Sequence, residues 1–124
     1  MKNEIVDPRY DQMKTLAARM IFKFGNAESP IHVAAQYSLM QGILFYFLGK
    51  NLDISINNLK VFIASEYFVD RKALNEFVKT VDDLEAKQAF ERSFYRDGEF
   101  DRSILLLVTK IIEKTDDAFL KSLT

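Results

Sequence analysis

The sequence predicts an all-α protein, a compact bundle of six to seven helices around a buried central helix at about residues 30–48. Three observations support this fold class. The stretch 30–48 has no charged side chain, although 28% of the 124 residues are charged. Apolar residues recur every three or four positions in most other segments. Proline, glycine and aspartate stand where helices are expected to begin and end.

The uncharged stretch, PIHVAAQYSLMQGILFYFL, is just long enough to cross a membrane. A helix that is apolar on every face is either surrounded by protein or lies in lipid. His32, Gln36, Ser38 and Gln41 are spread along the stretch, and each would be costly in hydrocarbon without a partner. Because the flanking segments are amphipathic, as a soluble core requires, we expect a central core helix and no membrane insertion.

Residues 8–22 are predicted to form the first helix. Asp7 can cap it, and Pro8 suits its first position because a proline there loses no needed N–H bond. Its apolar positions have helical spacing and are Met13, Leu16, Ala17, Met20 and Phe24. Gly25-Asn26 ends this helix, Ser29-Pro30 starts the uncharged one, and Gly49-Lys50-Asn51 ends it.

After a loop at 51–55, shorter helices are expected to begin at Ser55, Asp70 and Asp82. The β-branched residues of 52–64 allow a strand there, but the apolar spacing and the Asn57-Asn58 pair favour a helix. Asp97-Gly98 ends the helix that begins at Asp82. The residues expected to face the core are Ile56, Leu59, Phe62, Ile63, Leu74, Phe77, Val78, Val81, Ala86, Ala89, Phe90 and Phe94.

Two helices are expected at the end of the chain. Residues 100–114 contain ILLLV followed by II, which indicates a second heavily buried helix. Thr115-Asp116-Asp117 then starts a short helix that carries Phe119, Leu120 and Leu123. We therefore expect one domain spanning residues 1–124.

The composition excludes several kinds of active site. The chain has no cysteine, so a thiol nucleophile, a disulfide or a thiolate metal site cannot form. A single histidine excludes histidine metal clusters, and four scattered glycines do not form either common phosphate-binding loop. We expect no catalytic residue, no cofactor and no metal site in this chain, and hence no enzyme activity of its own.

Charge and the first residues bear on partners and location. The net charge of −1 disfavours a generally basic nucleic-acid binder, although a local basic patch stays compatible with it. The opening residues MKNEIVDPRYDQ contain no apolar run typical of a signal peptide, so a cytoplasmic location is expected.

Three stretches, in order, carry helix patterns of a known kind. Residues 7–21, DPRYDQMKTLAARMI, follow a D-x-R start with an L-A pattern. Residues 26–48 follow a pattern of the form A-A-R-x-L-L-x-G-L-x-x-Y-L, and residues 90–124 include DRSILLLVTKIIEKTDDAFLKSLT. Together they cover well over half of the chain and resemble the all-alpha domain of type IV coupling proteins, the ATPases of conjugation and type IV secretion. Two departures are Pro30-Ile31-His32 in place of an aromatic pair, and a single serine, Ser103, in place of two.

The resemblance implies a role within a larger protein. In that family the helical domain is inserted into a RecA-like nucleotide-binding fold, between the phosphate-binding loop and the acidic ATPase motif. The parent would be a hexamer anchored in the inner or cytoplasmic membrane, and this chain alone would not hydrolyse ATP. The implied role is recognition, at the cytosolic mouth of the ring, of a protein substrate, an adaptor or a relaxase–DNA complex.

The candidate partner-binding residues are basic or aromatic: Arg92, Tyr95, Arg96, Arg102, Lys110 and Lys114. Arg92 and Arg96 share a helix face, as do Lys110 and Lys114, because the members of each pair are four residues apart. Such a cluster can bind a phosphate backbone or an acidic signal on a protein. Acidic residues alternate with it, which favours a self-neutralised surface with weak, non-specific DNA contact at most. These are Glu91, Asp97, Glu99, Asp101 and Glu113.

Other conspicuous residues have structural interpretations. His32 is expected to be a hydrogen-bonded imidazole near a helix start, the alternative being a ligand or a pH switch. The acidic pairs Asp82-Asp83 and Asp116-Asp117, and Glu85 with Glu91, are expected to cap helices or face solvent.

Phe45, Tyr46 and Phe47 cannot all point inward from one helix. Some of them must contact a second layer of the core, or else a surface that a partner covers.

We therefore predict a substrate- or partner-docking helical domain of a coupling ATPase that serves conjugative DNA transfer or type IV secretion. Alternatives are a free-standing interaction or regulatory protein of phage or plasmid origin, and a secretion chaperone. A helical nucleic-acid-binding module is a further alternative, whose affinity for DNA would fall steeply as salt rises.

Overall fold

The computed structural model describes residues 7–25, 30–93 and 102–122, and within these ranges its regular structure is helical throughout. The all-α prediction is thereby confirmed. The elements are α1 (Pro8–Phe24), α2 (Pro30–Gly49), α3 (Ile56–Ile63), a 3₁₀ turn η1 (Glu66–Phe68), α4 (Arg71–Thr80), α5 (Leu84–Arg92), α6 (Arg102–Lys114) and α7 (Asp117–Lys121). Residues 52–64 thus contain the predicted helix rather than a strand.

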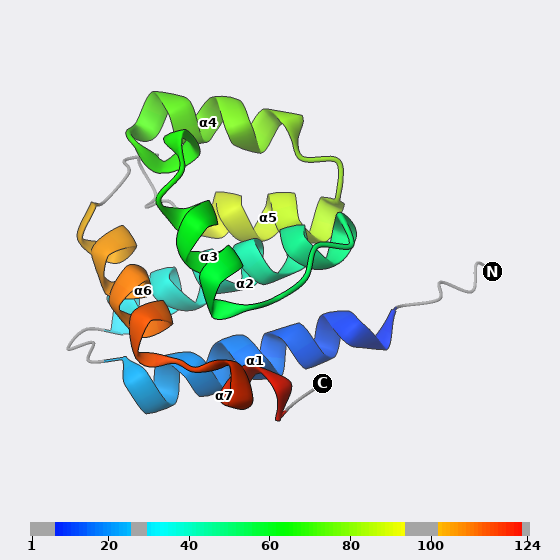
Figure 1. The fold of residues 1–124 in the computed structure, drawn as a ribbon. Coiled ribbons are helices and arrows are strands. Elements are labelled where there is room, and N and C mark those ends of the chain that lie inside the picture. The colour runs from blue at the N-terminus through cyan, green and yellow to red at the C-terminus, as the bar shows by residue number, and fades with distance from the viewer. Residues whose placement is uncertain (1–6, 26–29, 94–101, 123–124) are drawn as a thin grey trace.

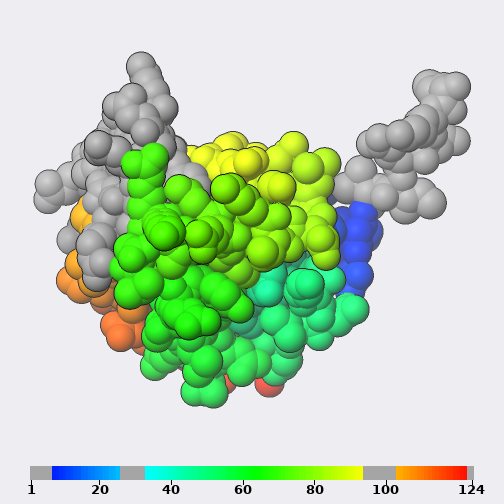
Figure 2. Space-filling view, turned by 90° about the horizontal axis from the view of Figure 1, so that it is seen from above, coloured from blue at the N-terminus to red at the C-terminus, as the bar shows by residue number. Residues whose placement is uncertain are grey.

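The uncharged helix α2 lies at the centre of the bundle (Figure 1). It packs against α5, α1 and α6. Helix α4 lies above α5, and Figure 2 shows side chains of these two helices over one face of the molecule. In α2 every described side chain from position 35 to 47 is buried except Tyr37 and Tyr46, which are half-buried. The prediction of a buried central helix is confirmed. None of the described helices combines the length and the apolar character that crossing a membrane requires.

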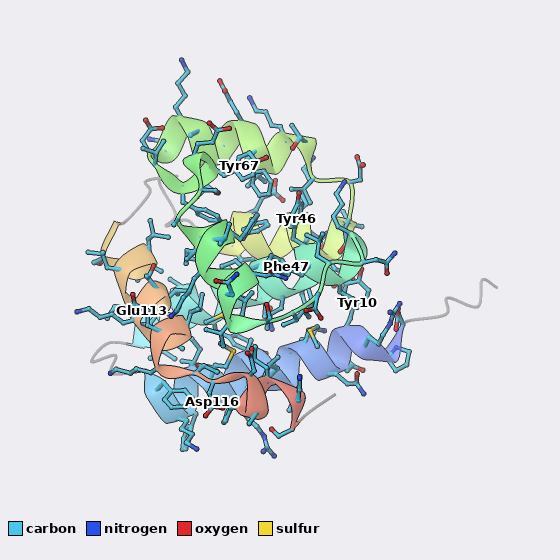
Figure 3. All side chains as sticks on the ribbon, viewed as in Figure 1. Tyr10, Tyr46, Phe47, Tyr67, Glu113 and Asp116 are labelled. Atoms are coloured by element: carbon cyan, nitrogen blue, oxygen red, sulfur yellow. The ribbon has the colours of Figure 1, made fainter. Side chains whose placement is uncertain are left out.

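The three consecutive aromatic residues of α2 contact three different helices. The Phe45 ring lies 5.2 Å from that of Tyr10 in α1, and Phe47 meets Phe62 of α3 edge-on at 5.3 Å. Tyr46 stacks on Phe62 and points toward Phe77 of α4 at 5.1 Å (Figure 3). These rings therefore contact a second layer of the core, which was the first of the two arrangements expected from the sequence.

Gly42 sets how closely α5 can approach α2. A Cβ atom at this position would lie 2.8 Å from Cδ1 of Phe90, closer than carbon atoms can pack. Phe90 is fully buried, so its ring occupies the space that any other residue at position 42 would fill. The glycine, which costs about 1 kcal/mol of helix propensity, thus allows α2 and α5 to make close contact.

Most predicted helix starts agree with the structure, but the predicted end of the helix that begins near Asp82 is wrong. Helix α5 ends at Arg92 with Ser93 as its C-cap, before the predicted end at Asp97-Gly98. The side chains that cap their own helices are Asp7, Ser55, Asp70 and Asp116. Helix α1 extends two residues beyond its predicted end, to Phe24, with Gly25 as its C-cap. At the end of α2, Asn51 has φ 56°, and the Leu52 N–H donates to the Phe47 carbonyl at 2.8 Å. This bond and the left-handed residue form a Schellman motif.

Two acidic residues expected to cap their own helices contact other helices instead. Asp117 accepts a hydrogen bond from the backbone N–H of Ile56 at 2.8 Å, so it caps α3 from α7. Asp83 makes no side-chain capping bond and accepts from the Tyr10 hydroxyl at 2.8 Å. Burial of the Tyr10 hydroxyl and this hydrogen bond raise its pKa from 10.0 to about 12.

A helix forms in the predicted segment 100–114, but the prediction that this helix is heavily buried is wrong. In α6 the fully covered residues form one stripe, Ile104, Val108, Ile111 and Ile112, whereas Leu106 is 59% exposed. The run ILLLV suggested cover on all sides, but α6 lies at the edge of the bundle, where one face meets solvent (Figure 1). The predicted positions of Phe94, Asp97-Gly98 and Leu123 lie outside the described residues.

Replacing Gly42 with alanine tests the contact between α2 and α5. We expect Gly42→Ala to lower the free energy of unfolding by about 1–2 kcal/mol, because overpacking outweighs the gain in helix propensity. Urea denaturation followed by circular dichroism measures this. In a Phe90→Leu background the same change should cost less, since the ring is gone. Equal or higher stability of Gly42→Ala in the parent background would contradict the packing argument.

Tyr10→Phe tests the link between α1 and α5. We expect this change to lower the free energy of unfolding by about 1 kcal/mol at neutral pH. Because the pKa of Tyr10 is higher in the folded state, the folded chain holds this proton more tightly than the unfolded one. The stabilisation is complete below pH 10.0 and is lost as pH rises toward about 12. Urea midpoints of both proteins over this range should therefore converge. A difference between the two urea midpoints that stays constant with pH would contradict the stabilising role of the Tyr10 hydroxyl.

Candidate functional site

Of the predicted basic cluster, the structure describes the side chains of Arg92, Lys110 and Lys114. Arg92 ends α5, and its guanidinium donates to the buried Gln41 side chain at 3.3 Å. This contact gives Arg92 a structural role. Tyr95 and Arg96, and the side chain of Arg102, lie outside the described residues, so that part of the prediction stays a prediction.

The predicted lysines lie on another helix. Lys110 and Lys114 are exposed on α6, with the exposed Glu113 between them in sequence. Residue 102 starts this helix, about 12 Å along the axis from Lys110. His32 lies in the first turn of α2, but its side chain is outside the described residues. Over 7–25, 30–93 and 102–122, no three acidic or histidine side chains gather as metal ligands would.

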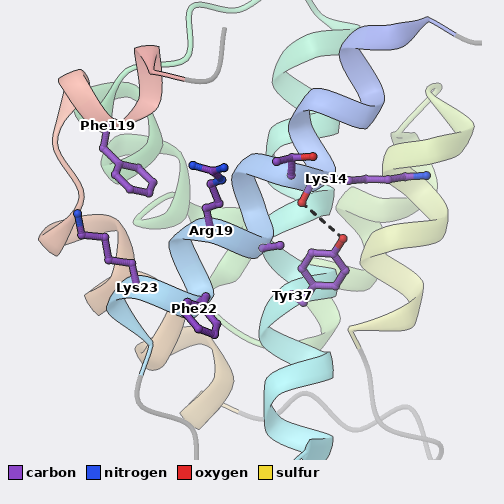
Figure 4. A pocket seen from close by; sticks show the side chains of 8 residues that line it. Lys14, Arg19, Phe22, Lys23, Tyr37 and Phe119 are labelled. Carbon is purple, nitrogen blue, oxygen red and sulfur yellow. Dashed lines mark hydrogen bonds between the residues drawn. The ribbon is translucent and has the colours of Figure 1, made fainter.

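In the described part of the chain a concave surface lies along α1. One hollow, of about 960 Å³, is lined by Lys14, Thr15, Ala18, Arg19, Phe22, Lys23, Tyr37 and Phe119. A second, of about 590 Å³, is lined by Ala18, Ile21, Phe22, Gly25, Val33, Ala34 and Tyr37. Because Ala18, Phe22 and Tyr37 line both hollows, the two are one continuous surface, which we call the α1 groove. Side chains from α1, α2 and α7 surround it (Figure 4).

Phe22 is the most unusual residue of the α1 groove. Its side chain is 92% exposed, more than any other large apolar residue in the described part of the chain. The core face of α1 is formed by Met13, Leu16, Ala17, Met20 and Ile21, so Phe22 points away from that face. Full exposure of a phenylalanine is unfavourable in water, and here it adjoins an apolar hollow on either side.

Neighbouring aromatic residues form the two walls of the α1 groove. On the α2 side, Tyr37 donates a long hydrogen bond of 3.5 Å to the Lys14 carbonyl. On the α7 side, the Phe119 ring meets Phe24 edge-on at 5.3 Å. The ammonium of Lys23 lies 5.2 Å from the Phe119 centroid, a cation–π distance. These contacts hold the walls in place beside Phe22.

All charged residues that line the α1 groove are basic. They are Lys14, Arg19 and Lys23, and each is exposed. Lys14 makes one loose ion pair with Asp11, at 3.9 Å, and Asp11 is not part of the lining. For Arg19 the described residues provide no ion pair. The lining therefore combines apolar residues with three basic ones, in a chain whose net charge is −1.

Sequence reasoning missed the α1 groove. It placed the end of the first helix at Phe22 and sought exposed aromatics in α2 instead. A signal was present, since Phe22 falls off the apolar stripe of its helix and is preceded by Arg19 and followed by Lys23. Its significance depends on the walls that α2 and α7 supply, and helical periodicity does not reveal which helices flank α1.

Comparison with known proteins finds no matching family model, no matching curated protein and no matching solved structure. The geometry of the α1 groove therefore carries the functional argument.

Phe22 should be dispensable for folding although it is a large aromatic residue. We expect Phe22→Ser to change the free energy of unfolding by no more than about 0.5 kcal/mol, because the ring buries almost nothing. Phe24→Ser is the matched control on the same helix. Phe24→Ser should lower the free energy of unfolding by about 1–2 kcal/mol, since Phe24 is half-buried against Phe119. Urea denaturation distinguishes them, and a large loss in Phe22→Ser would mean that the ring belongs to the core.

Proposed function

We propose that this chain is a protein-recognition domain that holds a segment of a partner protein in the α1 groove. The observation that carries the proposal is Phe22, a phenylalanine 92% exposed between two apolar hollows. An exposed apolar patch with a polar edge is typical of a protein interaction site. Large aromatic and arginine side chains are also the residues that contribute most to binding energy at interfaces.

The shape of the α1 groove favours a macromolecular partner over a small ligand. A small-molecule site encloses most of its ligand in a cavity. Here Phe22 projects outward, and three exposed basic residues lie beside apolar ones along the same surface. Aromatic and arginine side chains are enriched at protein–protein interfaces.

We further propose that the parent protein is a type IV coupling ATPase, for which this domain docks the cargo. The support is the sequence resemblance of residues 7–21, 26–48 and 90–124 to the all-alpha domain of that family. In this role the domain would hold a protein substrate, an adaptor or a relaxase–DNA complex and pass it to a membrane-anchored hexameric motor. A free-standing interaction protein or a secretion chaperone would bind its partner without such a motor.

Photo-crosslinking in the native host tests the docking role. A photoreactive amino acid at position 22 of the full-length protein should give a specific crosslinked protein, because that side chain would lie inside the interface. Position 84 is the matched control, since Leu84 is 62% exposed but lies on α5, outside the α1 groove. Identical crosslinks from both positions, or none from position 22, would contradict docking in the groove.

The reading frame of the gene tests the coupling ATPase separately. That assignment requires a GxxxxGK[ST] motif encoded upstream of residue 1 and an apolar strand ending in Asp-Glu encoded downstream of residue 124. A frame without these motifs would reject the ATPase parent and leave the docking role to the crosslinking result.

A further inference from the structure

We infer that the α1 groove binds an acidic amphipathic helix of a partner protein, one that carries two large apolar side chains a single turn apart. This inference rests on the proposed docking function and adds the chemistry of the partner. Three features of the groove support it: the place of Phe22 in both hollows, its length along α1, and the sign of its charges.

Phe22 lines both hollows of the groove. The first hollow extends to Phe119 of α7 and Tyr37 of α2, and the second extends to Val33 and Ala34 of α2. An occupant that covers Phe22 can therefore place one apolar side chain in each hollow. On a helix, residues three or four apart point the same way with Cβ atoms about 5–6 Å apart. One turn of a helix thus presents two apolar side chains, one for each hollow.

The length of the lining also suits a helix. The lining residues of α1 run from Lys14 to Gly25. At about 1.5 Å per residue this is roughly 16 Å, or about three helical turns. A helix of about three to four turns along α1 would cover Phe22, which lies toward the Gly25 end of this length, and would reach all three cations.

The charges of the lining select an acidic occupant. Lys14, Arg19 and Lys23 are all exposed, and no carboxylate lines either hollow. The whole chain carries 18 acidic residues against 17 basic ones, so this separation of charge is a local property of the groove. An amphipathic helix with carboxylates flanking its apolar residues would pair them with these cations while its apolar side chains enter the hollows.

Single-stranded nucleic acid is the competing occupant, since bases stack on exposed aromatic rings and phosphates bind cations. The lining favours protein, because six of its twelve residues have apolar side chains that cannot form hydrogen bonds with bases. These are Ala18, Ile21, Phe22, Val33, Ala34 and Phe119. Nucleic-acid affinity also depends on phosphate neutralisation, for which this chain of net charge −1 offers three cations at the site.

The test compares designed peptides by fluorescence anisotropy. The probe is a fluorescein-labelled helical peptide of about 14 residues with leucines at i and i+4 and glutamates on the flanks. Two matched peptides have lysines in place of the glutamates, or serines in place of the two leucines. The proteins are wild type, Phe22→Ala, the double variant Arg19→Glu/Lys23→Glu, and Leu84→Ala as the surface control, each checked for wild-type stability.

We expect the acidic peptide to bind wild type and Leu84→Ala alike. Binding should be at least about tenfold weaker for Phe22→Ala, for the charge-reversed double variant and for the serine peptide. It should also weaken as salt rises. The charge-reversed double variant should prefer the lysine peptide.

Two outcomes would overturn the inference. The first is equal, Phe22-dependent binding of the acidic and lysine peptides, which would retain the docking surface and reject the acidic partner. The second is no Phe22-dependent peptide binding at all. If a labelled oligothymidine then binds wild type but not Phe22→Ala, the occupant is nucleic acid. If wild type dimerises in sedimentation and Phe22→Ala does not, the occupant is a second copy of the chain. With equal binding of the acidic and lysine peptides, or with no peptide binding and no oligothymidine binding, a specific protein crosslink from position 22 would still support docking of a protein in the groove.

Discussion

The fold depends on one close contact, between the Gly42 backbone in the middle of α2 and the Phe90 ring of α5. Because Gly42 has no Cβ, the ring lies where a side chain would otherwise stand. Helix α5 can then cover one side of α2, while α1 and α6 cover others. Burying a phenylalanine contributes about 1.5–3 kcal/mol, which offsets the roughly 1 kcal/mol that glycine costs inside a helix. A helix without a polar stripe is stable here because neighbouring helices bury nearly all of its side chains between positions 35 and 47.

The polar residues inside α2 add little to this arrangement. Gln41 has a partner in Arg92, but both amide atoms of the fully buried Gln36 lack one in the described part of the chain. A buried amide without a partner costs about 1–3 kcal/mol. The central position of α2 therefore rests on the apolar cover supplied by its neighbours, including the rings of Tyr10, Phe62 and Phe77, and not on polar pairing.

Local signals made most of the fold predictable. Each helix start depends on a few adjacent residues, so Asp7, Ser55, Asp70 and Asp116 could be identified as caps from the sequence alone. Contacts between distant residues could not. The Asp83–Tyr10 bond joins residues 73 apart, and Asp117–Ile56 joins residues 61 apart. Likewise, Leu106 in ILLLV is exposed because α6 lies at the edge of the bundle, which is a property of the packing and not of the segment.

The α1 groove also depends on packing between distant parts of the chain, since its walls come from α2 and α7 while Phe22 comes from α1. An exposed phenylalanine between two hollows invites self-association, and the surrounding cations oppose it. Two copies that met groove to groove would bring Lys14, Arg19 and Lys23 of each against the same charges of the other, which is unfavourable. A partner with carboxylates at its edge meets no such repulsion. In the proposed complex the same three cations would oppose pairing of two copies and favour an acidic partner, so that charge would add specificity without additional buried area.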